Sequence, residues 1–258
     1  MDIGDFELGW FSLAGRNALV TGGNTGLGQA FTLALAKAGA DVFVPSLADD
    51  DGTTRGLVEA EGRRYEFAEA DITAAGEADR VVSECVTRLG SIDILVNSAG
   101  VCPLGEVLEY GRDKWDATIS VNLTAAFEMS HEAAKRMIPQ RSGKIVNICS
   151  MFSFLGGRTA PGYTASKHGI AGLTKAYCDE LAEYGIQVNG IAPGYYATAI
   201  TATTRANPES SQRVLDHIAA GRWGEPVDLM GAVVFLSSRA SDYVNGHVLS
   251  VDGGYLVR

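Results

Sequence analysis

The chain has 258 residues, of which 46% are hydrophobic, and its formal net charge is −10 at pH 7. This length and apolar content allow a single α/β domain with a substantial core. The acidic balance, without any block of five or six basic residues, argues against nucleic acid and against an anionic membrane surface as partners.

Targeting and metal signals are weak throughout the chain. The acidic N-terminus lacks the apolar centre of a signal peptide, and no apolar run reaches the roughly 18 residues of a membrane span. The four cysteines and four histidines do not have the spacing of a metal site or a CxxC redox pair. We therefore expect a cytoplasmic protein with no membrane association, no metal, and buried free thiols.

Short apolar or β-branched runs alternate with helical patterns along the chain. The expected strands are 18–21, 41–45, 65–71, 92–100, 144–150, 186–194 and 247–254, and the expected helices are 27–39, 112–139, 162–184 and 226–238. Such alternation is typical of βαβ units with right-handed crossovers, and it predicts an α/β fold with a parallel sheet. The strands lack clean period-two patterning, as expected when helices cover both faces of a sheet. Residues 195–220 interrupt the alternation, and we interpret them as an insertion over the functional site.

A glycine-rich segment, TGGNTGLG at 21–28, follows the first expected strand and opens the first expected helix. In a dinucleotide site Gly22 would allow the tight turn, Gly26 the approach of a pyrophosphate, and Gly28 close packing of helix on sheet. The helix N-terminus would add partial positive charge for the phosphates. A purely structural turn is the alternative, but the strand before and the helix after favour a dinucleotide.

The end of the second strand usually separates NAD from NADP, because an acid there binds the ribose 2′-hydroxyl and repels a 2′-phosphate. Ser46 occupies that position, and no basic residue stands at 46–48. Thr25, again not a basic residue, precedes Gly26. The sequence therefore leaves both NAD and NADP open.

Tyr163 and Lys167, in the segment YTASK, are four residues apart where a helix is expected to begin. Residues at that spacing lie on one helix face, one turn apart, so a phenol and an ammonium would lie side by side. An ordinary amphipathic helix would show the same spacing, so the pair needs support from other motifs.

That support comes from six motifs that occur in one order: TGGNTGLG, NSAG at 97–100, VNL with Asn122, Ser150 thirteen residues before Tyr163, YTASK, and APG at 192–194. Together they resemble the short-chain dehydrogenase/reductase family over residues 12–258, which leaves 1–11 as an N-terminal extension. The resemblance implies one Rossmann-type, doubly wound domain whose seven-stranded parallel sheet has helices on both faces. It also implies NAD(P)-dependent hydride transfer and a homo-oligomer, either a dimer or a tetramer.

The resemblance further implies a catalytic set of Asn122, Ser150, Tyr163 and Lys167. A tyrosine with an ordinary pKa of about 10 is a poor base at neutral pH. The Lys167 ammonium, together with the positive nicotinamide, is expected to lower the pKa of Tyr163. Ser150 would bind the substrate oxygen, and Asn122 would hold a water that links Lys167 to solvent.

By the same resemblance, a larger set of residues is assigned to the coenzyme. It consists of Gly22, Asn24, Thr25, Gly26, Leu27, Gly28, Ser46, Asp71, Ile72, Asn97, Ala99, Gly100, Tyr163, Lys167, Pro193, Gly194 and Thr198. Two departures stand out: the family more often has two asparagines where this chain has Asn97 and Ser98, and Ser46 leaves the choice of coenzyme open.

Flanking segments, including SMFSFLGG and AGRWGEPVDLMG, resemble dehydrogenases of sugar acids that act at C5 of 2-dehydro-3-deoxy-D-gluconate or gluconate. Such a small-molecule substrate carries a carboxylate, so a cation near the pocket is expected. The arginines considered are Arg158, Arg205 and Arg222, and the substrate-binding set is Ser150, Tyr163, Arg158, Tyr196 and Arg222.

Two other functions stay open at this point. One is reduction of another carbonyl compound, such as a 3-oxoacyl thioester or a steroid, although a carrier-linked substrate would need a basic docking patch that the sequence lacks. The other is a dinucleotide sensor without catalysis, which could afford to lose a catalytic set that this chain retains.

Overall fold

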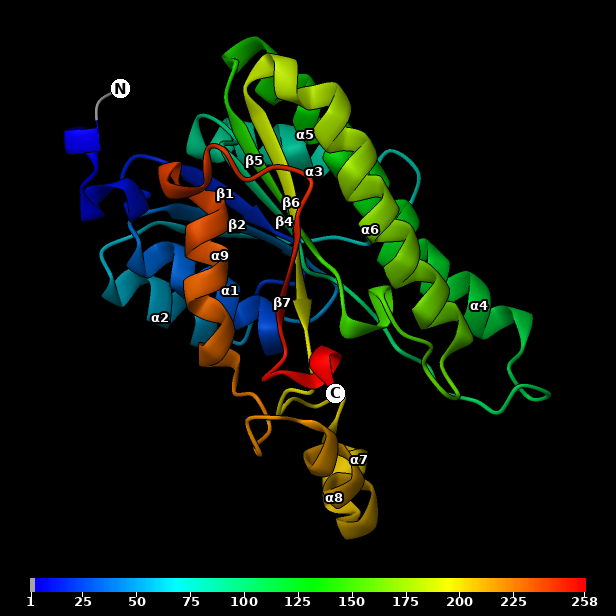
Figure 1. Ribbon diagram of the computed structural model, residues 1–258. Helices are drawn as coiled ribbons and strands as arrows, with labels where there is room; N and C mark the ends of the chain where they lie inside the picture. The colour runs from blue at the N-terminus through cyan, green and yellow to red at the C-terminus, as the bar shows by residue number, and fades with distance from the viewer. Residues whose placement is uncertain (1–2) are drawn as a thin grey trace.

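The computed structural model describes residues 3–258. Within them seven strands form one sheet in the order β3-β2-β1-β4-β5-β6-β7, and every neighbouring pair is parallel (Figure 1). The strands are β1 Asn17–Val20, β2 Asp41–Ser46, β3 Tyr65–Glu69, β4 Ile94–Asn97, β5 Gly143–Ile148, β6 Ile186–Pro193 and β7 Val248–Val251. The expected α/β fold with a doubly wound parallel sheet is confirmed.

Helices connect the strands and lie on both sides of the sheet (Figure 1). They are α1 Gly26–Lys37, α2 Thr53–Ala60, α3 Glu77–Leu89, α4 Arg112–Ile119, α5 Ala125–Gln140, α6 Pro161–Leu181, α7 Ala202–Ala206, α8 Pro208–His217 and α9 Met230–Ser237. The expected helix over 112–139 is divided by a π-helical segment, Ser120–Thr124, between α4 and α5. No helix in the described part of the chain is long and apolar enough to cross a membrane.

Each central strand buries both of its faces. Ala18 and Val20 of β1 belong to the core under α1 and α9, whereas Leu19 between them belongs to the core under α3 and α5. Ile94 and Leu95 of β4 divide between the two cores in the same way. Apolar residues are therefore needed at consecutive positions, which explains why the strands show no period-two pattern.

The crevice at the carboxyl end of the sheet opens where the strand order reverses, between β1 and β4. There the Thr21 hydroxyl accepts hydrogen bonds from the backbone N–H groups of Ser98, at 2.9 Å, and Ala99, at 3.0 Å. These bonds fix the loop after β1 against the loop after β4. Ligands of open α/β sheets bind at such a reversal point.

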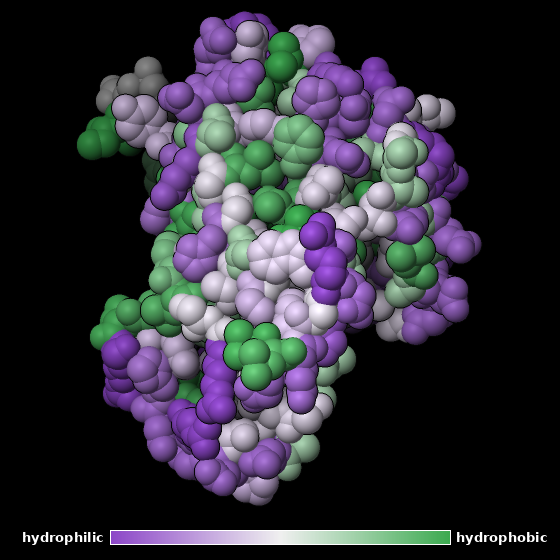
Figure 2. All heavy atoms as spheres, turned by 90° about the vertical axis from the view of Figure 1, so that its right-hand side faces the viewer, coloured by the Kyte–Doolittle hydropathy of each residue, from purple (hydrophilic) through white to green (hydrophobic). Residues whose placement is uncertain are grey.

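The segment 195–220, expected to be an insertion over the site, contains α7 and α8. These helices lie beyond the carboxyl end of β6 (Figure 1). Figure 2 shows this lower end of the molecule with a mostly hydrophilic visible surface. Of the four free thiols, Cys85 and Cys149 are buried, but Cys102 and Cys178 are partly exposed, so the expectation of buried thiols is only half right.

Candidate active site

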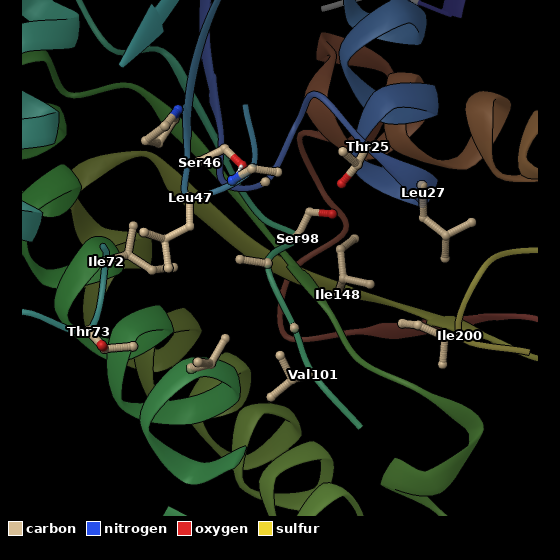
Figure 3. A pocket seen from close by; sticks show the side chains of 18 of the residues that line it. Thr25, Leu27, Ser46, Leu47, Ile72, Thr73, Ser98, Val101, Ile148 and Ile200 are labelled. Carbon is tan, nitrogen blue, oxygen red and sulfur yellow. Dashed lines mark hydrogen bonds between the residues drawn. The ribbon is translucent and has the colours of Figure 1, made fainter. Parts of the chain in front are cut away.

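A cavity of about 510 Å³ occupies the crevice at the carboxyl ends of β1, β2, β4 and β5. Figure 3 shows Leu47 and Ile72 close together at one end of it, and Leu27 and Ile200 at the other. Many residues assigned to the coenzyme line this cavity: Gly22, Thr25, Gly26, Leu27, Gly28, Ser46, Asp71, Ile72, Ala99, Gly100, Tyr163, Lys167 and Thr198. The fold thus brings the separate motifs together around one space.

The glycine-rich loop has the shape that a dinucleotide pyrophosphate requires. Gly26 has a φ of +53°, and a Cβ there would meet no protein atom within 4 Å, so the bare backbone faces the cavity. A Cβ on Gly28 would lie 2.2 Å from the carbonyl oxygen of Gly22, so only glycine lets α1 pack this closely on the loop. Thr25, the N-cap of α1, makes no side-chain capping bond, which leaves the first N–H groups of α1 available to an anion.

Among the described residues that line the cavity, the corner with Ser46, Leu47 and Ala48 includes no arginine or lysine. The Ser46 hydroxyl accepts a hydrogen bond from the backbone N–H of Ala48 at 3.1 Å. The nearest arginine, Arg55, pairs with Asp50 at 3.3 Å. This corner therefore has neither a basic group that would grip a 2′-phosphate nor an acid at the strand end itself.

Four residues assigned to the coenzyme do not line the cavity: Asn24, Asn97, Pro193 and Gly194. The Asn24 amide donates to the carbonyl oxygens of Ala48 and Asp49, so it braces the loop. The Asn97 amide donates to Ser130 and Asn147 inside the core, because the side chain of this last β4 residue turns toward α5. Gly194 packs against Asp252, where a Cβ would lie 2.7 Å from the Asp252 Cα. The assignment of these four residues to the coenzyme stays a prediction.

Tyr163 and Lys167 lie in the first turns of α6, which begins at Pro161, and both face the cavity. The Lys167 Nζ lies 5.5 Å from the centre of the Tyr163 ring. The same Nζ donates to the carbonyl oxygen of Ile148 at 2.6 Å, which ties α6 to the end of β5. The expected proximity of the phenol and the amine is present.

Ser150 joins this pair from the turn after β5. It caps a short 3₁₀ helix, Met151–Ser153, and its hydroxyl accepts from the Phe152 N–H at 3.2 Å. The Ser150 side chain also lies near enough to Tyr163 to lower the pKa of the phenol in part. Phe152 packs edge-on against the Tyr163 ring, with 6.2 Å between the ring centroids. Two hydroxyl groups thus converge where a substrate oxygen could accept or donate a hydrogen bond.

Asn122 is almost fully buried in the π-helical segment. Its side-chain oxygen accepts from the Val101 N–H at 2.8 Å, and its amide donates to the Val101 carbonyl and the Ser166 hydroxyl. These bonds connect the π segment to the loop after β4 and to α6. Because the protein already occupies the side chain, the expected water-holding role of the Asn122 amide is not supported. π-bulges are often found at functional sites, so the segment still marks this region.

Burial dominates the electrostatics of the pair. It raises the pKa of Tyr163 above its ordinary value, and the Ser150 side chain opposes this only in part. Burial also lowers the pKa of Lys167 to about 8. Burial is the largest cause of the Tyr163 shift, and the lowering expected from Lys167 together with the positive nicotinamide stays a prediction. The Tyr163 phenol is therefore protonated at neutral pH.

Two of the residues assigned to the substrate lie elsewhere, in a second cavity of about 270 Å³. The Arg222 guanidinium there forms two bonds with Asp228, at 2.6 and 2.9 Å, so its charge is already neutralised. The Tyr196 hydroxyl donates to the Val251 carbonyl at 2.9 Å, and its ring packs on Gly224. Neither side chain is placed to bind a substrate in the large cavity, which corrects both assignments.

The other two arginines differ from Arg222. Arg205, on α7, donates to the carbonyl of Thr198 at 3.0 Å. Arg158 is exposed on the loop between Ser150 and Tyr163, and within residues 3–258 the structure gives its guanidinium no ion pair. The assignment of Arg158 to a substrate carboxylate stays a prediction.

Several cavity residues were missed by the sequence analysis: Pro45, Leu47, Ala48, Ala70, Thr73, Ser98, Val101, Val121, Ile148, Ala199 and Ile200. Most of them directly flank a recognised motif, and that adjacency is the signal that could have found them. The role of Ile148 rests on its backbone carbonyl, which no residue type encodes. Among residues 3–258 no group of three His, Cys, Asp or Glu side chains could hold a metal.

Comparison with known proteins agrees with this geometry. A family model described as "Enoyl-(Acyl carrier protein) reductase", of the short-chain alcohol dehydrogenase type, matches residues 22–256. An uncharacterized oxidoreductase of Escherichia coli K12, YgcW, is 62% identical over 98% of this chain and 97% of its own. The 2-dehydro-3-deoxy-D-gluconate 5-dehydrogenase of the same strain is 47% identical over 96% of this chain and 98% of its own.

Among solved structures, a gluconate 5-dehydrogenase from Burkholderia cenocepacia J2315 in complex with NADP and tartrate has a similar fold. Its TM-score is 0.93 at 37% identity, and the match covers 97% of this chain and 99% of that chain. The similarity thus extends over nearly the whole chain.

Proposed function

Because this chain belongs to the short-chain dehydrogenase/reductase family, we propose that it interconverts the C5 hydroxyl and ketone of an open-chain sugar acid, either 2-dehydro-3-deoxy-D-gluconate or gluconate. The coarser description is established by its relatives. The chain is an NAD(P)-dependent oxidoreductase that acts on CH–OH groups and is related to gluconate and 2-dehydro-3-deoxy-D-gluconate 5-dehydrogenases.

In this proposal the large cavity holds the coenzyme. The loop with Gly22, Gly26 and Gly28 and the N-terminus of α1 would bind the pyrophosphate, and Ser46 and Asp71 would lie at the adenosine end. Tyr163 and Lys167 would lie at the nicotinamide end. The bound coenzyme would supply the hydride donor or acceptor, and the positive charge of its oxidised form would favour the Tyr163 phenolate.

The chain's own contribution is control of one proton. In the reduction direction, the protonated Tyr163 phenol donates its proton to the substrate oxygen, while Ser150 hydrogen-bonds that oxygen and stabilises its developing charge. In the oxidation direction, Tyr163 would accept the hydroxyl proton as the phenolate, the form that the positive charge of the oxidised coenzyme favours. Lys167 holds positive charge close to the phenol throughout and is itself fixed by the Ile148 carbonyl.

One observation carries the catalytic part of the proposal: Ser150, Tyr163 and Lys167, from two separate segments, converge beside a single dinucleotide-shaped cavity. A binding-only sensor would not need two hydroxyls and an amine in this arrangement. The sugar-acid substrate is supported by the relatives at 41–47% identity, which are named for 2-dehydro-3-deoxy-D-gluconate or 5-keto-D-gluconate.

A substrate panel tests the proposal. Oxidation and reduction are followed by coenzyme absorbance, with both coenzymes, on gluconate, 5-keto-D-gluconate and 2-dehydro-3-deoxy-D-gluconate. A neutral polyol and an acetoacetyl thioester serve as controls. We expect kcat/KM for a sugar acid to exceed that for the polyol by about 10- to 100-fold, the worth of one charge-assisted hydrogen bond. A higher kcat/KM for the thioester would instead favour a carrier-linked reductase.

A further inference from the structure

A third cavity, of about 420 Å³, lies at the opposite end of the strands from the candidate active site. It is formed at the amino ends of β1, β4, β5 and β6, together with the turn after α9. Its charged lining consists of Arg16, Asp93, Arg141, Lys144, Arg239 and Asp242. We call it the amino-end cavity. None of these residues takes part in the chemistry proposed above.

The charges of the amino-end cavity do not balance. Arg16 pairs with Asp93 at 3.1 Å, and Lys144 pairs with Asp242 at 2.8 Å. Arg141 donates only to the backbone carbonyl of Glu183. Within residues 3–258 the structure pairs neither Arg141 nor the remaining Arg239 with a carboxylate. Two guanidinium charges are therefore left over in one recess of a chain whose net charge is −10.

Arg239 is held in place without an acidic partner. Its guanidinium carbon lies 4.2 Å from the centre of the Trp10 ring, a cation–π contact. Such stacking uses the flat face of the guanidinium and leaves its N–H groups at the edge free to bind an anion. It also places a fluorescent side chain directly against the cavity lining.

An unsatisfied hydroxyl gives a second, independent indication of a ligand. Ser237, the last residue of α9, lines the amino-end cavity and is 4% exposed. Its hydroxyl is buried and has no hydrogen-bond partner within residues 3–258. Buried polar groups normally have a hydrogen-bond partner. An unpartnered hydroxyl in the same cavity lining as two guanidinium groups without an ion pair suggests that a polar ligand supplies that partner.

We propose that the amino-end cavity binds a small multivalent anion, with Arg141 and Arg239 as its charged ligands and Ser237 as a hydrogen-bonding group. The volume suits a small molecule rather than a polymer. The shared chemistry is two or more negative oxygens, supplied by a phosphate compound or by a polycarboxylate. Because the chain is acidic overall, affinity here depends on these local cations.

Isothermal titration calorimetry tests the site, with pyrophosphate and citrate as separate probes. The protein is saturated with reduced coenzyme beforehand, so that the glycine-rich loop is filled. We expect one binding event per chain, weakened by added salt, and a change in Trp10 emission at the same midpoint. Binding of pyrophosphate alone would identify the phosphate class, and binding of citrate alone the polycarboxylate class. Failure of both probes to bind at millimolar concentration would overturn the proposal.

Matched variants locate the event. Arg141→Gln and Arg239→Gln should each weaken binding by about tenfold or more, the loss expected for a hydrogen bond to a charged group. Arg112→Gln removes an equally exposed charge from α4, where Arg112 pairs with Asp116, and should leave binding unchanged. Arg141→Lys keeps the charge and should retain most of the affinity. Equal affinities in the Arg141, Arg239 and Arg112 variants would place the anion elsewhere.

Discussion

The coenzyme half of the site and its substrate half are built in different ways. The coenzyme half, around Gly22, Gly26 and Gly28, is shaped by the backbone: bare glycines, a helix N-terminus and strand ends. Residues expected in the substrate half depend instead on which partner each side chain takes: Arg222 and Tyr196 lie in the second cavity, bound to Asp228 and Val251. A short motif can encode the first kind of surface completely. The second kind depends on distant residues, so we expect mutations in the two halves to have separable effects.

The largest expected effect comes from Tyr163→Phe, which removes the proton donor at the junction of the coenzyme half and the substrate half. We expect kcat to fall by about 10²- to 10⁴-fold, the usual contribution of a general acid or base. Coenzyme affinity, measured by fluorescence titration, should hardly change, because the ring and its packing against Phe152 remain. Near-native turnover by this variant would remove Tyr163 from the mechanism.

Two glycine substitutions should separate shape from stability within the coenzyme half. In Gly28→Ala the new Cβ meets the Gly22 carbonyl, so we expect a loss of about 1–3 kcal/mol in the free energy of unfolding along with weaker coenzyme binding. In Gly26→Ala the Cβ meets no protein atom, so the strain is limited to about 1–2 kcal/mol from the positive φ. Its methyl group projects into the cavity and should still weaken coenzyme binding.

Urea unfolding and coenzyme titration of both variants measure these two quantities separately. If Gly26→Ala bound the coenzyme as tightly as the parent chain, the backbone at this position would not face the ligand.

In the substrate half, Arg158→Ala should raise KM for a sugar acid by about tenfold while leaving KM for a neutral polyol unchanged, because a charge-assisted hydrogen bond is lost. Arg222→Ala is the matched control, since its guanidinium is already bound by Asp228. Steady-state kinetics on both substrates provide the comparison. Selective loss in the Arg222 variant alone would reverse the two assignments.

The smallest effect is expected for Tyr196→Phe. Loss of the hydrogen bond to the Val251 carbonyl should cost about 1 kcal/mol of stability. The ratio of KM values for sugar acid and polyol should not change, because the Tyr196 hydroxyl is bound to the Val251 carbonyl in the lining of the second cavity. Denaturant melts and kinetics on the same preparation check both statements.

Much of the fold could be predicted because buried parallel strands and helix boundaries have local signals. All seven strands overlap their expected ranges, although the strand expected at 92–100 is only Ile94–Asn97. No helix was expected at α2 or α3. In α3 the buried residues Ala78, Val81, Val82, Cys85 and Leu89 follow a helical period, a signal that was present but overlooked.

The role of a site residue could be predicted where residue type and spacing determine it. It could not be predicted where it depends on the direction in which the side chain points. The spacing of Tyr163 and Lys167 fixes their common helix face, so their proximity followed from the sequence. Asn97 lies in the right motif, but its side chain turns into the core toward Ser130 and Asn147. The pKa of Tyr163 depends on how deeply the folded chain buries it, which the one-turn spacing does not reveal.

The central claim is that the charge of Lys167, close to the Tyr163 phenol, is required for proton transfer. Its most direct test is the pH dependence of kcat/KM for the reduced coenzyme in the reduction direction, which reports groups of the free enzyme. Burial lowers the pKa of Lys167 to about 8, so its charged fraction falls as the pH rises through that value, while Tyr163, with its raised pKa, stays protonated.

We therefore predict that kcat/KM declines above about pH 8 in the parent chain, and that Lys167→Met is slower and lacks this decline. An identical decline in Lys167→Met, or a flat profile through this range in the parent chain, would contradict the account.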